Sequence, residues 1–342
     1  MHCWATDTDD ATVDPKFGKV GKQKIENTGP LTIARMKTID DEFTDAALAW
    51  MDKQAKADKP FFCYYNSTRM HVFTHLKKES EGKTGLGLYP DGMVEHDGHV
   101  GQLLKKLDDL KVADNTIVVF TTDNGAEVMS WPDGGSTPFR GEKDTNWEGG
   151  WRVPCVMRWP GVIEPGRIIN DMCSLQDFIP TFAAAAGEPD LVEKVKKGYK
   201  IGSRTFKAHL DGFNLIPFLS GKEPKSPRNG FLYWSDDGDL MGLRVAQYKI
   251  VFAEQRSKGL DVWREPLSVL RIPKMFDLRA DPFERGEESF KYGDWFVEHV
   301  PLQYAAQAIV HEWLESFKEF PPRQKPASFT IDQILETLIP AA

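Results

Sequence analysis

Apolar residues recur at helical spacing in two long stretches of the chain. Between residues 40 and 58, side chains such as Phe43 and Trp50 return to one face every three or four positions. Residues 91–110 repeat the pattern, with Leu107 on the apolar face and lysines and aspartates on the other. Each stretch therefore predicts an amphipathic helix.

Two short apolar runs accompany these helices. Residues 61–65 and 116–120 are continuously apolar or aromatic, which is typical of strands buried on both faces of a parallel sheet. A strand, a helix and a second strand in this order predict a βαβ unit, whose ligands gather beyond the carboxyl ends of the strands. Residues 153–159 predict a return to the same sheet.

The rest of the chain predicts a smaller second part. Closely spaced strand patterns separated by turn residues indicate a small antiparallel sheet, and helical patterns precede and follow it. The predicted strands span residues 230–234, 240–252 and 275–278, and the predicted helices span residues 177–186, 215–219, 302–317 and 331–338. We therefore predict an α/β core over residues 1–225 and a sheet subdomain with a helical tail over 226–342.

Composition supports a folded chain of two parts. The 342 residues are 41% hydrophobic and 27% charged, which is ordinary for globular proteins. Single cores stop growing at roughly 250 to 300 residues, so two units are expected.

Charge and residue order exclude several partners. The formal net charge is −8 and no continuous basic stripe occurs, which argues against nucleic acid. No apolar run reaches the roughly 18 residues that a membrane span needs, and residues 1–10 do not resemble a signal peptide. We therefore expect a soluble chain, without assigning a compartment. The four cysteines lack the C-x-x-C spacing of a zinc site.

The clearest candidate chemistry follows the second predicted strand. Asp123 and Asn124 would place a carboxylate and a carboxamide at the sheet edge, where their oxygens suit a hard cation such as calcium or magnesium. The alternative is an ordinary turn, because Asp, Asn and Gly all favour turns.

Three further side chains could act at the same edge. His71, in the loop after residues 61–65, could donate a proton to a leaving group or a hydrogen bond to an oxyanion, and His75 is a second candidate. Lys143 could bind sulfate or phosphate oxygens, although an exposed surface role fits each of these residues too. A cation, an imidazole and an ammonium together suit an anionic ester substrate.

Longer segments around these residues resemble the arylsulfatase family, within the alkaline-phosphatase-like superfamily. In chain order they are PFF at 60–62, NSTRMH at 66–71, DNTIVVFTTDNG at 114–125, FRGEK at 139–143, WEGGWRVP at 147–154, RWPG at 158–161, DFIPT at 177–181 and FDLRADPFE at 276–284. The resemblance is strongest over residues 59–187 and looser beyond them.

The resemblance implies a role for each candidate. Asp123 and Asn124 would be metal ligands, usually for calcium, Lys143 would bind and act on the sulfate group, and His71 would act at the leaving group. The family attacks sulfur with a formylglycine made from cysteine or serine, while the cation offsets charge on the sulfuryl oxygens. The implied reaction is hydrolysis of sulfate esters, and the implied fold is a mainly parallel sheet flanked by helices.

The chain also departs from this family. Inspection of the four cysteines and of Ser226 finds no Cys/Ser-x-Pro-x-Arg motif, so we predict a chain without the nucleophile. The paired aspartates Asp9 and Asp10 follow a polar stretch that predicts no strand. We therefore expect the resemblance to cover the family's carboxyl-terminal portion, with weak metal binding and with either a missing amino-terminal segment or a homo-oligomer covering the exposed sheet edge.

Three functions follow from this reading. The first is sulfate-ester hydrolysis, for which family parents are often periplasmic or secreted. The second is hydrolysis of phosphodiesters or phosphonate monoesters on the same scaffold, and the third is non-catalytic binding of sulfated glycans.

Overall fold

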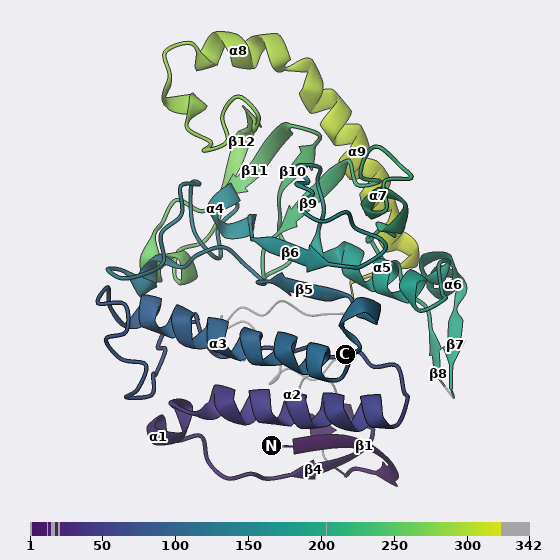
Figure 1. Cartoon of the computed structure of the whole chain (residues 1–342). Helices are drawn as coiled ribbons and strands as arrows, with labels where there is room; N and C mark the ends of the chain where they lie inside the picture. Colours follow the sequence, from purple (N-terminus) through teal and green to yellow (C-terminus); the bar gives the residue numbers. More distant parts are fainter. Residues whose placement is uncertain (1, 12, 15–17, 20, 203, 323–342) are drawn as a thin grey trace. The chain divides into compact units, whose positions relative to one another are not determined.

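The chain forms two compact units in the computed structural model (Figure 1). They span Met1–Leu110 and Lys111–Ala342, and the structure describes residues 2–11, 13–14, 18–19, 21–202 and 204–322. The predicted division at residue 225 falls inside the second unit. Among the described residues, every helix is too short or too polar to traverse a lipid bilayer.

The first unit contains both predicted amphipathic helices. Helix α1 spans Ile33–Met36, α2 spans Ile39–Lys56 and α3 spans Leu88–Asp109, and α2 and α3 run side by side (Figure 1). The periodic apolar positions therefore identified α2 and α3 correctly. Acidic residues in the first turn of α2 and lysines in its last turn complement the helix dipole.

Short antiparallel pairs precede these helices. Strand β1, His2–Asp9, pairs with β4, Lys22–Glu26, and β2, Val13–Asp14, pairs with β3, Gly18–Lys19. The expectation that no strand precedes Asp9 is wrong, because pairing with β4 supplies the backbone partners that polar side chains do not predict.

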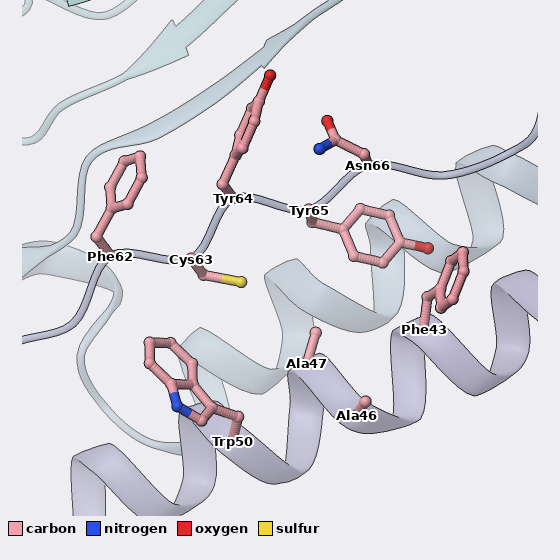
Figure 2. A pocket seen from close by; sticks show the side chains of 9 residues that line it. All are labelled: Phe43, Ala46, Ala47, Trp50, Phe62, Cys63, Tyr64, Tyr65 and Asn66. Carbon is pink, nitrogen blue, oxygen red and sulfur yellow. The ribbon is translucent and has the colours of Figure 1, made fainter. Parts of the chain in front are cut away.

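The prediction of a strand at residues 61–65 is wrong. This segment is extended chain without a ladder partner among the described residues, and Phe62 and Tyr64 are 68% and 78% exposed. Together with α2 it lines an open, largely apolar pocket (Figure 2). An apolar run becomes a buried strand only when neighbouring strands take up its backbone groups, and among the described residues no strand forms a ladder with residues 61–65.

The second unit begins with the predicted strand after α3. Strand β5, Val118–Thr121, pairs antiparallel with β6, Cys155–Arg158, which confirms the predicted return of residues 153–159 to the strand after α3. The helices here are α4, Glu148–Trp151, α5, Phe178–Ala185, α6, Leu191–Lys197, and α7, Ile216–Leu219. Strands β7, Tyr199–Ile201, and β8, Arg204–Phe206, form a hairpin.

The predicted antiparallel sheet is confirmed in the second unit. Its order is β12–β11–β10–β9, with bounds Ser268–Asp277, Tyr248–Glu254, Leu240–Val245 and Gly230–Trp234. The prediction of one strand over residues 240–252 is wrong, because a turn at residues 246–247 divides this stretch into the hairpin of β10 and β11. Helices α8, Tyr292–His299, and α9, Pro301–Glu319, follow, and α9 places Ala306 in a core with Leu243 and Ile250. The predicted helix at 331–338 lies outside the described residues.

Candidate functional site

The candidate metal ligands follow β5 as predicted. The strand ends at Thr121, and Asp123 is exposed while Asn124 is partly buried. The Asn124 side-chain nitrogen donates to the Gly125 carbonyl at 2.8 Å, and the Thr122 hydroxyl donates to Asp123 Oδ1 at 3.3 Å. Asn124 Oδ1 and the Asp123 carboxylate are therefore the acceptor atoms that this turn presents.

Glycine backbones fix this turn against the loop that carries Lys143. Gly125 N donates to Gly150 O at 2.9 Å, and a Cβ on Gly125 would lie 1.8 Å from Gly149 O. Only glycine permits such an approach between two backbones. The Lys143 backbone N–H also donates to Ala126 O at 2.9 Å, so the structure brings the Asp123–Asn124 turn together with the Lys143 loop, residues 139–150.

The Lys143 ammonium lies at a mixed acidic and aromatic position. Its Nζ is 3.9 Å from Glu127 Oε2 and 5.5 Å from the centroid of the Trp263 ring, and the side chain is 21% exposed. The separation from Glu127 exceeds hydrogen-bond length, so the ammonium keeps donors for an incoming anion.

The residue before Lys143 anchors two short 3-10 helices. Glu142 is buried, and its carboxylate accepts from Val128 N at 2.8 Å and from Gly259 N at 2.7 Å. Val128 begins η2, Val128–Ser130, and Gly259 begins η4, Gly259–Trp263. One carboxylate thus holds the starts of both helices beside the Lys143 backbone.

A buried ionic cluster supports the other end of the loop. Lys249, fully buried on β11, contacts Glu284 at 2.7 Å and Glu148 at 3.2 Å, and Glu148 also accepts from Arg152 and the Tyr233 hydroxyl. Burial alone would raise the pKa of Glu148, but the charge of Lys249 and the Arg152 hydrogen bond together lower it to about 2. Burial raises the pKa of Glu284. This cluster ties α4 to the C-terminal sheet.

Asp144 is the titratable group beside Lys143 whose pKa is most altered. Burial, followed by the charges of Asp236 and Asp237, raises its pKa from 3.8 to about 6. The environment of Asp144 therefore favours its neutral, protonated form next to the candidate anion site.

The candidate histidines belong to the first unit, whereas Asp123, Asn124 and Lys143 belong to the second. His71 is exposed, with Nδ1 3.1 Å from the Val72 carbonyl, and His75 is partly buried.

Their loop is anchored by Arg69, which is buried between Asp40 at 2.7 Å and Glu95 at 2.6 Å. The roles of the two histidines stay predictions.

Comparison with known proteins identifies the family. The family model described as Sulfatase matches residues 6–188. The chain belongs to the sulfatase family. It is 34% identical over 241 residues to arylsulfatase A of Homo sapiens and 31% identical over 266 residues to N-acetylgalactosamine-6-sulfatase of Canis lupus familiaris.

The matches cover much of this chain but less of its relatives. They span 67% and 72% of this sulfatase chain, and 44% and 48% of the two relatives, so the chain spans about half of their length. The solved sulfatase PsFucS1 from Pseudoalteromonas sp. aligns with a TM-score of 0.73 at 26% identity, over 89% of this chain and 57% of that one. This structural likeness confirms the predicted α/β, alkaline-phosphatase-like fold.

The chain does contain a match to the nucleophile motif, contrary to the prediction from its cysteines and Ser226. The residues Ser136-Thr137-Pro138-Phe139-Arg140 meet the Cys/Ser-x-Pro-x-Arg spacing, with serine in place of cysteine. Ser136 is exposed in the loop before Lys143. Arg140 donates to Glu287 at 2.6 Å and to the Glu284 carbonyl at 2.9 Å, and it lies 3.5 Å from the Trp147 ring centroid. The arginine of this match therefore already has a structural role.

The candidate ligands are of the right chemical kind for a divalent metal, but they are fewer than such a metal needs. Asp123 and Asn124 offer the oxygen donors that calcium prefers, but calcium takes about 6 to 8 of them. Within the described part of the chain, no three His, Cys, Asp or Glu side chains are grouped to hold a metal.

Proposed function

We propose that this sulfatase chain binds the sulfate group of a sulfate ester at Lys143 for hydrolysis of that ester. The observation that carries the proposal is the fixed position of Lys143: its backbone bonds to Ala126, two residues after Asn124, and its ammonium keeps free donors. An ammonium held next to oxygen ligands for a cation suits a tetrahedral anion.

The chemistry of the proposed site divides among named residues. Lys143 would donate hydrogen bonds to the sulfuryl oxygens and offset their charge while a water oxygen forms a new bond to sulfur and the bond to the leaving-group oxygen breaks. Asp123 and Asn124 would hold a divalent cation, for which calcium is the expected identity, and that cation would add further positive charge. His71 keeps its predicted role as proton donor to the leaving-group oxygen.

The acidic neighbours of Lys143 set the expected strength of binding. Glu127 lies 3.9 Å away and Asp144 is adjacent in sequence, so an incoming dianion meets repulsion as well as attraction. We therefore expect sulfate to bind weakly without a cation and more strongly when calcium is added.

Calorimetric titration of the full chain with inorganic sulfate, with and without calcium, tests the proposal. Lys143→Ala should weaken sulfate binding about tenfold or more, because a hydrogen bond to a charged group contributes about 1.5 to 3 kcal/mol. Lys105→Ala is the matched control, since Lys105 is an exposed lysine paired with Asp109 on α3. Equal sulfate affinity in the Lys143 and Lys105 variants, or no binding by the unaltered chain, would contradict the proposal.

Substrate preference needs a parallel experiment. Rates of hydrolysis of a sulfate ester and of a phosphodiester should be compared, with His71→Ala in each assay. We expect the sulfate ester to react faster, and we expect His71→Ala to slow the reaction while sulfate affinity stays unchanged. Faster phosphodiester hydrolysis would favour the second function.

A further inference from the structure

Two short helices beside Lys143 expose apolar side chains to solvent. Helix η2 and the residue after it expose Val128, Met129 and Trp131, and η4 exposes Leu260 at 49% and Trp263 at 44%. Helices η2 and η4 contact each other. Contiguous exposed apolar side chains mark a binding surface more often than scattered ones do.

The surface is held in place from the Lys143 loop. Glu142 accepts backbone hydrogen bonds from the first residue of each helix. Gln255, which is buried, receives the Trp147 indole N–H at its carbonyl, donates its backbone N–H to Asn146, and donates its side-chain amide to the Val262 carbonyl. Hydrogen bonds from residues 142–147 therefore hold η4 in place without any ligand.

The Trp263 ring lies close to the candidate sulfate-binding group. Its centroid lies 5.5 Å from Lys143 Nζ, and nearly half of the side chain is open to solvent. A sulfate ester carries its charge at one end and its alcohol half one oxygen atom away. An anion on Lys143 would therefore place its alcohol half close to Trp263 and its neighbours.

We propose that Trp263, together with Leu260 on the same helix and Met129 on the contacting helix η2, forms the subsite for the alcohol half of the ester and selects an apolar ring. The inference rests on the proposed function, because it takes Lys143 as the sulfate-binding group. Leucine and methionine side chains pack against hydrocarbon and offer little to sugar hydroxyls, while the tryptophan face stacks on a flat ring. An aryl alcohol half fits this combination better than a polar sugar does.

Binding of three probes to the full chain separates the two claims. Inorganic sulfate, phenyl sulfate and a glucose sulfate ester are titrated calorimetrically into the unaltered chain, Trp263→Ala, Trp263→Phe and Lys143→Ala. Trp263→Ala should weaken phenyl sulfate about fivefold, since aromatic pairs contribute about 0.5 to 1.5 kcal/mol, and leave inorganic sulfate within about twofold. Trp263→Phe should restore most of the phenyl sulfate affinity, and glucose sulfate should bind no better than inorganic sulfate.

Controls keep each outcome decisive. Trp50→Ala removes a tryptophan of similar exposure, 38%, from the first unit and should change no affinity. Leu260→Ser serves as a second subsite variant if Trp263→Ala lowers the melting temperature. Equal weakening of inorganic and phenyl sulfate by Trp263→Ala would overturn the subsite, because Trp263 would then only position Lys143. Glucose sulfate affinity that depends on Trp263 as strongly as phenyl sulfate affinity would overturn the apolar selection. Sulfate binding that survives Lys143→Ala would instead reject the proposed function.

Discussion

The Lys143 loop, residues 139–150, and the aromatic segment, residues 61–66, contrast sharply in how the chain holds them. Buried residues anchor the loop through Glu142, Glu148 and the close approach of Gly125 to Gly149. The aromatic segment leaves Tyr64 exposed and has no strand partner among the described residues. Polar contacts that are buried and paired fix a position, whereas apolar character alone does not.

The largest effect should follow from removing the buried lysine behind the loop. Lys249→Met leaves Glu148 and Glu284 without their shared cation, and breaking a buried ion pair costs about 3 to 5 kcal/mol. Urea denaturation measures the loss, and Lys105→Met, at an exposed pair, should change stability by less than about 0.5 kcal/mol. Similar values for both variants would remove the distinction between the two regions.

A smaller loss should follow from crowding the glycine contact. Gly125→Ala forces a backbone shift because the new Cβ would meet Gly149 O at 1.8 Å, and such overpacking costs about 1 to 3 kcal/mol. Gly125→Ala should also weaken sulfate binding, because the shift moves the backbone that positions Lys143. Gly98→Ala is the control, since nothing lies within 4 Å of the added Cβ in α3 and alanine favours helix. Gly98→Ala should leave sulfate binding unchanged and stabilise the chain slightly.

The acidic neighbour of Lys143 should make binding depend on pH. Asp144 has a pKa raised to about 6, so its contribution to stability is present below 3.8 and is lost as pH rises through about 6. Sulfate affinity should fall by roughly twofold to fivefold over the same interval as the carboxylate ionises. Asp144→Asn should flatten both pH profiles, as followed by melting temperature and calorimetry. Profiles that stay unchanged in Asp144→Asn would assign the effect to another group.

The smallest effect should come from the aromatic segment. Tyr64→Ser removes a side chain that is 78% exposed and should change stability by less than about 0.5 kcal/mol. Tyr65→Phe removes the bond to Thr44, 2.9 Å long, and should cost about 0.5 to 1.5 kcal/mol. Urea denaturation compares the two. A larger loss at Tyr64 than at Tyr65 would show that the segment is held more firmly than its exposure indicates.

Sequence patterns identified local structure better than long-range structure. The periodicity of α2 and α3 and the antiparallel character of the sheet β9 to β12 depend on nearby residues and were predicted correctly, although the turn between β10 and β11 was missed. The prediction of a strand at residues 61–65 was wrong because a strand needs hydrogen-bonding partners that are distant in sequence, and a local pattern does not reveal them.

The candidate site shows the same limit. Asp123, Asn124 and Lys143 were found from motifs, whereas Lys249 and Trp263 are more than a hundred residues from Lys143 and carried no local signal. Ser136 did carry a signal, namely its spacing to Pro138 and Arg140. The sequence could therefore have revealed it.

The most direct test of the central claim, that Lys143 binds the sulfate group, is an NMR titration of the isotope-labelled chain with phenyl sulfate. The amide signals of Ala126, Lys143 and Gly259 should shift together with one saturating dissociation constant, and these shifts should disappear in Lys143→Ala. Shifts that persist in Lys143→Ala, or that appear only outside Ala126, the Lys143 loop, η2 and η4, would contradict the claim.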